Sequence, residues 1–297
     1  MTPDGARAVV AEVMGQDAVC AVALQGGLIN HVFRVGLADG RTVVLKHAPA
    51  HVVTAPSIAL DPGRIRVEAA AMRAVGPPRV PRVLAQVDSV LLMEDLGDLP
   101  DIVEWVSSAG DGNAWGTLAE WLRGLHDGPA LGIHNASMQC TRLDVQYRSV
   151  GAWLGPLGVP DGARLAARAL ALGRRWLRPG PCFVMGDLWP PSVRVRPDGS
   201  LVIIDWEMST QGHRGQDLGH FCAHLALGAH RGTVSSDAES RFCAAYGPVS
   251  AETTRDMAVH AGCELLTRSV GAFPMPLTTD QQDAVVQDGL ARLRGAG

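Results

Sequence analysis

Hydrophobic residues in the first third of the chain form short runs that are separated by glycine and aspartate–glycine turns. The runs 18–25, 31–37 and 42–48 predict three β-strands, because short apolar runs between turn residues are typical of strands. A helical spacing of apolar residues follows at 64–75, and the run 80–95 predicts two more strands. This order predicts a small antiparallel sheet accompanied by one helix.

Beyond about residue 95 the apolar spacing becomes that of amphipathic helices. Five segments follow this pattern: 115–128, 163–177, 217–227 and those that begin near Ser250 and near Thr279. Thr279 followed by Gln282 is typical of a helix-starting capping box. The segment 192–205 alternates around a Pro-Asp-Gly turn and predicts a hairpin. A mainly β front therefore precedes a mainly α remainder, which is an α+β pattern.

Composition narrows the range of partners. The chain has 297 residues, 47% of them hydrophobic, so it can bury a large core without disulfide bonds. A net charge of −4 argues against nucleic acid and against anionic membrane surfaces. The N-terminus lacks the features of a signal peptide, and the six cysteines form no CxxC pair. We expect a cytoplasmic protein with no nucleic-acid or membrane partner; the sequence leaves its oligomeric state open.

Two aspartates close apolar runs on either side of the predicted hairpin. Asp187 follows Gly186 and precedes a proline-stiffened loop, and Asp205 follows the run LVII. A carboxylate at the end of a buried strand is costly without a cation, and Mg²⁺ is a natural one. Two such acids fit a phosphoryl-transfer site, where one takes a hydroxyl proton and the other holds Mg²⁺. The alternatives are an acid that caps a turn and a structural ion pair.

Weaker candidates lie earlier and later in the chain. The Gly26–Gly27 turn would let backbone N–H groups approach a phosphate, although such a pair is more often only a turn. Lys46 ends the apolar run TVVLK on the third predicted strand, and Glu68 is the only carboxylate of the following helix, so the two can pair. The alternative is an edge lysine and a solvated glutamate. Asp217 is interpreted as a helix N-cap that supports the acidic loop.

In combination, these residues resemble the aminoglycoside phosphotransferase and choline kinase-like family of small-molecule kinases. The match runs from about Val22 to Leu225 and includes the segments LLMED, MGDLWPPS, IIDWE and the later DLG. The resemblance implies a two-lobed, protein-kinase-like α+β fold. Residues 1–94 would form a small antiparallel β lobe that binds nucleotide, and residues 95–297 a larger, mainly helical lobe.

The resemblance also implies an enzyme that uses ATP and Mg²⁺ to phosphorylate a hydroxyl group of a small molecule. Asp187 would be the catalytic base and Asp205 a Mg²⁺ ligand. The residues implied in nucleotide binding are Gly26, Gly27, Asn30, Lys46, Glu68, Glu94 and Leu96. Lys46, held by Glu68, would position the phosphates, and the backbone from Glu94 to Leu96 would receive adenine.

Two positions depart from the family pattern. Met185 stands where the family usually has histidine, and Ser192 where it usually has an asparagine that binds a second Mg²⁺. The methylthioribose kinase-like branch of the family is similar to this chain at the position of Ser192. It has serine there and an Asp-x-Glu metal-binding motif, which matches Asp205 and Glu207. We therefore expect Ser192 and Glu207 to be metal ligands, with Glu207 compensating for the weaker hydroxyl.

One alternative to a kinase function remains, and the sequence does not identify the molecule that would accept the phosphoryl group. A non-catalytic nucleotide-binding pseudokinase or ligand sensor, with a metal site weakened by Ser192, is the other reading. Little sequence separates Asp205 from Asp217, which disfavours a protein substrate. An aminoglycoside would call for an acidic pocket, for which Asp217, Asp256 and Glu264 are candidates, whereas choline would call for an aromatic cage.

Overall fold

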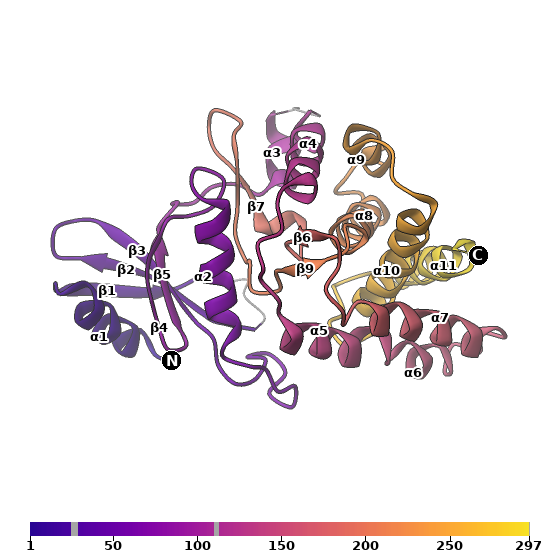
Figure 1. Cartoon of the computed structure of the whole chain (residues 1–297), viewed down its shortest axis with the longest axis horizontal. Coiled ribbons are helices and arrows are strands. Elements are labelled where there is room, and N and C mark those ends of the chain that lie inside the picture. Colours follow the sequence, from indigo (N-terminus) through magenta and orange to yellow (C-terminus); the bar gives the residue numbers. More distant parts are fainter. Residues whose placement is uncertain (25–28, 110–112, 297) are drawn as a thin grey trace. The chain divides into compact units, whose positions relative to one another are not determined.

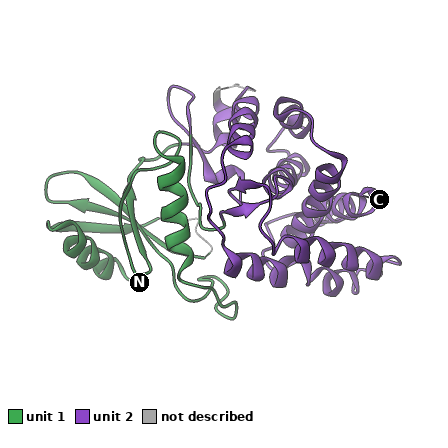
Figure 2. Cartoon of the chain, in the orientation of Figure 1, with its two compact units in different colours: residues 1–99, 202–208 green, residues 100–201, 209–297 purple. Residues whose placement is uncertain are grey.

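The computed structural model describes residues 1–24, 29–109 and 113–296, and it divides into two compact units (Figure 2). The first unit comprises Met1–Leu99 with Val202–Met208, and the second comprises Pro100–Leu201 with Ser209–Gly297. The predicted boundary at residue 94 lies close to the division at Leu99, whereas the return of Val202–Met208 to the first unit was not predicted. The assignment of nucleotide binding to residues 1–94 stays a prediction.

The first unit is built on a five-stranded antiparallel sheet with the order β1-β2-β3-β5-β4 (Figure 1). Its strands are β1 (Ala18–Ala23), β2 (His31–Leu37), β3 (Thr42–His47), β4 (Val83–Val87) and β5 (Val90–Glu94). Helix α1 (Pro3–Met14) contacts β1 and β2, and α2 (Arg64–Val75) contacts β4 and β5. The small antiparallel sheet with one following helix, predicted from the apolar runs, is confirmed.

The two faces of this sheet have different chemistry. Leu45 on β3 pairs with Phe33 on β2 and with Leu92 on β5, and all three are buried in a core that also contains Val10 of α1. Because successive side chains of a strand point to opposite faces, Lys46 lies on the other face of the sheet. The alternation that buries Leu45 thus places a lysine on the opposite face.

The second unit is mainly helical (Figure 1). Its helices are α3 (Ile102–Ala109), α4 (Ala114–Asp127), α5 (Ala136–Arg142), α6 (Val150–Leu154), α7 (Gly162–Arg175), α8 (Gly215–His230), α9 (Ala238–Tyr246), α10 (Ala251–Ser269) and α11 (Thr279–Gly295). A one-turn π-helix, Leu143–Tyr147, directly continues α5. Helix α10 packs against both α8 and α11. The five predicted helices are present, whereas α3, α5, α6, α9 and the π-helix were not predicted.

Short strands carry the acidic segments. β6 (Cys182–Val184) pairs with β9 (Thr210–Gly212), and β7 (Val193–Val195) forms the predicted hairpin with β8 (Leu201–Ile203). The hairpin turn is closed by the N–H of Arg196, which donates to the carbonyl oxygen of Ser200 at 2.9 Å. Asp187 follows β6, and Asp205 follows β8, so each predicted acid does stand just beyond a strand.

One predicted helix start is wrong by one residue. The capping box of α11 is formed by Thr278 and Gln281, not by Thr279 and Gln282. The segment Thr-Thr-Asp-Gln-Gln satisfies the pattern in both registers, and Thr278 takes the extended backbone conformation that an N-cap needs.

Among the described residues, no helix combines the length and apolar character that crossing a membrane requires.

Candidate active site

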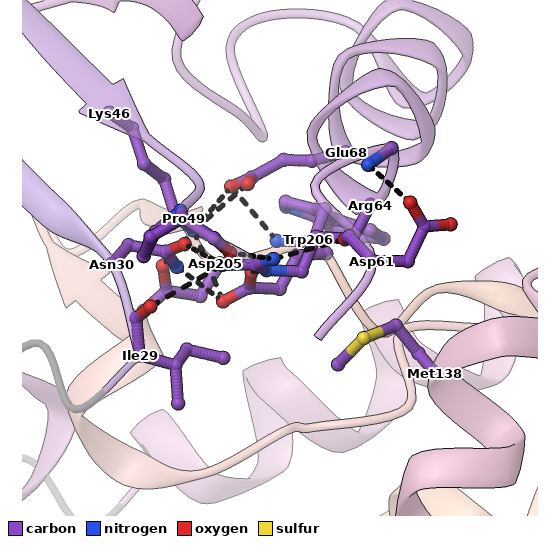
Figure 3. Close-up of polar contacts among 12 residues, drawn as sticks. Ile29, Asn30, Lys46, Pro49, Asp61, Arg64, Glu68, Met138, Asp205 and Trp206 are labelled. Atoms are coloured by element: carbon purple, nitrogen blue, oxygen red, sulfur yellow. Dashed lines mark hydrogen bonds and ion pairs between the residues drawn. The ribbon is translucent and has the colours of Figure 1, made fainter. Parts of the chain in front are cut away.

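Lys46 is the centre of a buried ionic cluster in the first unit (Figure 3). Its side chain is 3% exposed, and Nζ lies 2.9 Å from Oε1 of Glu68 and 2.7 Å from Oδ1 of Asp205. Burial acts to lower the pKa of Lys46, but the carboxylates of Asp205, Glu207 and Glu68 outweigh it and raise that pKa well above its usual value. The predicted pairing of Lys46 with Glu68 is present, and the lysine is charged.

Asp205 is the exposed carboxylate of the cluster. Its side chain is 41% exposed, against 1% for Glu68 and 6% for Glu207. Its backbone has φ = 64°, a left-handed conformation that a non-glycine residue rarely adopts and that recurs at functional sites. The next residue, Trp206, is fully buried, and its indole N–H donates to the carbonyl oxygen of Ile203 at 2.9 Å. Trp206 is therefore a core residue.

Arg64 is the residue that sequence reasoning missed in this cluster. Its fully buried guanidinium donates to Oε2 of Glu207 from Nε, and to Oδ1 of Asn30 from Nη2, both at 2.9 Å. Nη1 donates to the carbonyl oxygen of Pro49 at 2.8 Å, and Nδ2 of Asn30 donates to Oε1 of Glu207 at 2.7 Å. A usable signal existed, because Arg64 and Glu68 are four residues apart and share one face of α2.

The cluster contains more acids than bases. Three carboxylates, on Glu68, Asp205 and Glu207, surround the two cations Lys46 and Arg64. Burial raises the pKa of Glu68 to about 7, and the neighbouring carboxylates of Glu207 and Asp205 add to this rise against the opposing effect of Lys46. An excess of carboxylates, of which that of Asp205 is exposed, suits a hard cation such as Mg²⁺.

The other predicted nucleotide-binding residues are placed as follows. Gly26 and Gly27 lie outside the described residues. Glu94 is the last residue of β5, and its Oε2 accepts a hydrogen bond from the N–H of Arg82 at 3.0 Å. Leu96 follows in the half-buried chain after the strand. A role for Glu94 and Leu96 in adenine binding stays a prediction.

In the second unit, Asp217 holds the loop that carries Asp187. The backbone N–H groups of Met185 and Gly186 donate to the fully buried carboxylate of Asp217 at 2.9 and 2.6 Å. Gly186 has φ = 86°, a conformation that suits glycine. The predicted support of the acidic loop is confirmed, but the predicted N-cap is wrong: Asp217 lies in the first turn of α8, and the N-cap is Arg214.

Two residues that the sequence did not reveal lie beside the carboxylate of Asp187. Its side chain is 34% exposed, and Oδ1 lies 3.2 Å from Nη2 of Arg142 and 3.4 Å from Nε2 of His220. Arg142 ends α5, and His220 belongs to α8, so both come from elements distant in sequence from the loop. A partly exposed carboxylate whose orientation is fixed by neighbouring donors is suited to accept a proton at a defined place.

Ser192 ends a short 3₁₀ turn, Pro190–Ser192, that follows Trp189. Its hydroxyl is buried and donates to the carbonyl oxygen of Trp189 at 2.7 Å. The predicted stiffness of this loop is thus reinforced by a hydrogen bond. Ser192 and Asp187 belong to the second unit, whereas Asp205 and Glu207 belong to the first, so their sharing of one metal–nucleotide pocket stays a prediction.

The three acids considered for an acidic acceptor pocket are already engaged. Asp217 receives the loop N–H groups, and Asp256 is paired with Arg175. Oε1 of Glu264 accepts from Nε of Arg268 at 2.6 Å, and Oε2 accepts from Gln146 at 2.6 Å.

Comparisons with known proteins bear on the family and the fold of the chain. The profile described as "Phosphotransferase enzyme family" matches residues 21–258. A structure named as a putative fructosamine-3-kinase from Thermobifida fusca has a TM-score of 0.62 and 22% identity, over 99% of this chain and 100% of that one. No curated protein matches the chain.

Two further solved structures share the fold. Choline kinase LicA from Streptococcus pneumoniae has a TM-score of 0.61 and 12% identity, over 98% of both chains. The spectinomycin phosphotransferase APH(9)-Ia, in complex with ADP and spectinomycin, has a TM-score of 0.58 and 13% identity, again over 98% of both chains. The predicted kinase-like α+β fold is confirmed, and the chain belongs to the phosphotransferase enzyme family of small-molecule kinases.

Proposed function

We propose that this protein transfers the γ-phosphoryl group of ATP, together with Mg²⁺, to a hydroxyl group of a small molecule. The observation that supports this most directly is the buried contact of Lys46 with both Glu68 and Asp205. In kinases, a strand lysine held by a helix glutamate contacts the nucleotide phosphates, and an aspartate nearby holds the metal. Structures that share the fold were determined with ADP and with AMP, which agrees with a nucleotide in this role.

The first unit would bind the nucleotide. Lys46 would place its charge against the phosphates, and Asp205, the exposed carboxylate of the cluster, would be the principal Mg²⁺ ligand. When bound, Mg²⁺ neutralises charge on the phosphate oxygens. Arg64 and Asn30 fix Glu207, so this second predicted ligand needs little reorganisation to bind the metal.

The second unit would supply the base. Asp187 would accept the proton of the acceptor hydroxyl, and Asp217 would keep the loop that carries it in place through Met185 and Gly186. Phosphoryl transfer requires mainly positioning and electrostatic stabilisation, so a rigid loop with one accessible carboxylate is a sufficient contribution.

The test combines nucleotide binding with turnover. Binding of ATP with and without Mg²⁺ would be measured by calorimetry, and ADP release would be followed with a panel of acceptors. The panel would contain fructosamines, choline, ethanolamine, aminoglycosides, macrolides and methylthioribose-like sugars. We expect Mg²⁺-dependent binding and at least one acceptor that stimulates ADP release.

Two variants test whether Asp187 acts in turnover and not in nucleotide binding. Asp187→Asn should lower turnover by about a hundredfold to ten thousandfold with nucleotide binding retained, since it removes a general base. Asp198→Asn, in the exposed hairpin turn, is the matched control and should behave as the wild type. Equal turnover in Asp187→Asn would refute the assigned base. Nucleotide binding without turnover on any acceptor would favour the pseudokinase reading instead.

A further inference from the structure

A buried polar cluster adjoins the predicted catalytic carboxylate in the second unit. We call it the His220 cluster; its members are Arg142, Gln146, His220, His224, Glu264 and Arg268. Helices α8 and α10 supply four of these residues, and α5 with the π-helix supplies the other two. π-Helical turns are rare and are frequently found at functional sites. Sequence reasoning placed none of these residues beside Asp187.

His220 lies between two carboxylates. Its side chain is 2% exposed; Nε2 is 3.4 Å from Oδ1 of Asp187, and Nδ1 is 3.8 Å from Oε2 of Glu264. Within the part of the chain that the structure describes, neither ring nitrogen has a hydrogen-bond partner. Buried polar atoms in native proteins almost always have one, so these two nitrogens need an explanation.

The protonation state of His220 indicates which of its ring nitrogens carries the proton. Burial lowers the pKa of His220 well below its usual value, with His224, Arg142 and His260 adding to the decrease against the effect of Glu264. The ring is therefore neutral and carries one N–H. The nearer acceptor is Asp187, so the Nε2–H tautomer has a partner to approach, whereas Nδ1 lies beyond hydrogen-bond distance from Glu264.

Glu264 anchors the cluster from the other side. It accepts from Arg268 and from Gln146, both at 2.6 Å, and lies 3.2 Å from Nε2 of His224. Burial acts to raise the pKa of Glu264, but the charge of Arg268 and the hydrogen bond with His224 outweigh it and hold that pKa well below its usual range. The cluster is thus a fixed arrangement of paired charges next to Asp187.

A metal ion is a competing explanation for the same residues. The ligand atoms of His220, His224 and Glu264 lie within 4.8 Å of one another, which is close enough for three ligands of one ion. The guanidinium of Arg268, however, already occupies Oε1 of Glu264, and its charge would repel a divalent cation there. The geometry therefore favours contact with Asp187 over metal binding.

We propose that His220 is a positioning residue for Asp187. Its Nε2–H approaches the same oxygen, Oδ1, that Arg142 contacts, so two donors from different helices orient one carboxylate. The contact of 3.4 Å shortens to a hydrogen bond in the reacting complex, as catalytic hydrogen bonds often do. This inference rests on the proposed role of Asp187 as the base.

Three substitutions of His220 test the geometry. Gln places an amide N–H near the position of Nε2, Asn places one near Nδ1, and Leu removes both polar atoms. His230→Gln is the matched control, because His230 lies on the same helix and contacts Asp288 outside the cluster. The readout is the steady-state rate of ADP formation from Mg²⁺–ATP with water as the acceptor, together with the KM for ATP.

We expect His220→Leu and His220→Asn to lower kcat by about tenfold to a hundredfold with unchanged KM, which is the size of loss that a misplaced reacting group produces. His220→Gln should retain most of the wild-type rate. Wild-type kcat in His220→Leu would overturn the proposal. If Asp187→Asn were also fully active, the failure would lie in the proposed function itself.

A second measurement does not depend on activity. In ¹⁵N imidazole spectra, we expect His220 to carry its proton on Nε2, and that signal to move in Asp187→Asn while the signals of His230 stay in place. An Nδ1 proton, or no change in Asp187→Asn, would refute the contact. Stoichiometric binding of Zn²⁺ that is lost in His224→Ala would overturn the proposal in favour of a metal site.

Discussion

Replacing Asp217 with asparagine tests whether the loop of Asp187 is held by a buried carboxylate. Oδ1 accepts from the N–H of Gly186, and Oδ2 accepts from the N–H of Met185 and contacts Nε2 of His126 at 3.0 Å. Asparagine has nearly the same shape, but one oxygen becomes an NH₂ group. All three partners of Asp217 donate hydrogen bonds to it. The NH₂ group of asparagine is itself a donor, so it must face at least one of these donors without forming a hydrogen bond.

The size of the effect follows from these contacts. The least costly orientation keeps the amide oxygen at Oδ2, towards Met185 and His126, and leaves the N–H of Gly186 without an acceptor. A buried donor without a partner costs about 1–3 kcal/mol, and a neutral acceptor weakens the other two bonds by a few tenths to about 1 kcal/mol each, which together gives roughly 2–5 kcal/mol. A loss of that size lowers Tm by roughly 4–20 °C in a unit of this length.

The assay compares stability with catalysis. Urea unfolding followed by circular dichroism gives the free energy of unfolding, and ADP release gives kcat and the KM for ATP. We expect kcat to fall, because Gly186 directly precedes Asp187, and the KM for ATP to stay unchanged. Asp280→Asn, an exposed acid in the first turn of α11, is the matched control and should change stability by less than about 0.5 kcal/mol. Wild-type stability and kcat in Asp217→Asn would refute the reasoning.

Two further predictions concern buried charges. Arg64→Met leaves Glu207 buried without its guanidinium, so we expect a loss of about 3–5 kcal/mol in thermal unfolding and weaker ATP binding by calorimetry; an unchanged melting temperature would contradict this. Glu264 has a pKa below its ordinary value of 4.5, so its stabilisation is present above that pH and is lost as pH falls through the folded pKa. Urea titrations below pH 5 should therefore show a shallower acid decline in Glu264→Gln, and equal declines in both proteins would exclude the effect.

The elements of the first unit could be predicted because local pattern and tertiary environment agree there. The runs that predict β2 and β3 alternate around buried Phe33 and Leu45, and each is bounded by turn residues. Lys46 and Glu68 were identifiable as partners because the helix offers one carboxylate and the strand contains one lysine. For the strands and for the Lys46–Glu68 pair alike, the local sequence pattern permits only one simple structural arrangement.

The residues that escaped prediction are polar groups buried by distant segments. Arg142 and His220 both contact Asp187, yet one ends α5 and the other lies within α8, and periodicity carries no information on such pairs. Arg142 also precedes a π-helix, which has no reliable sequence signature. Asp217 shows the intermediate case, since an acid near a helix start was recognised but its true partners, Met185 and Gly186, follow only from packing.

The charge pattern of the second unit also bears on the acceptor. Asp217, Asp256 and Glu264 would have been the natural anions for a polycationic acceptor, but each already holds a backbone donor or an arginine. Separating Glu264 from Arg268 would leave a buried charge unpaired, at a cost of about 3–5 kcal/mol, and a surface-like contact with an ammonium group returns less than that. These three acids therefore contribute little affinity for an aminoglycoside.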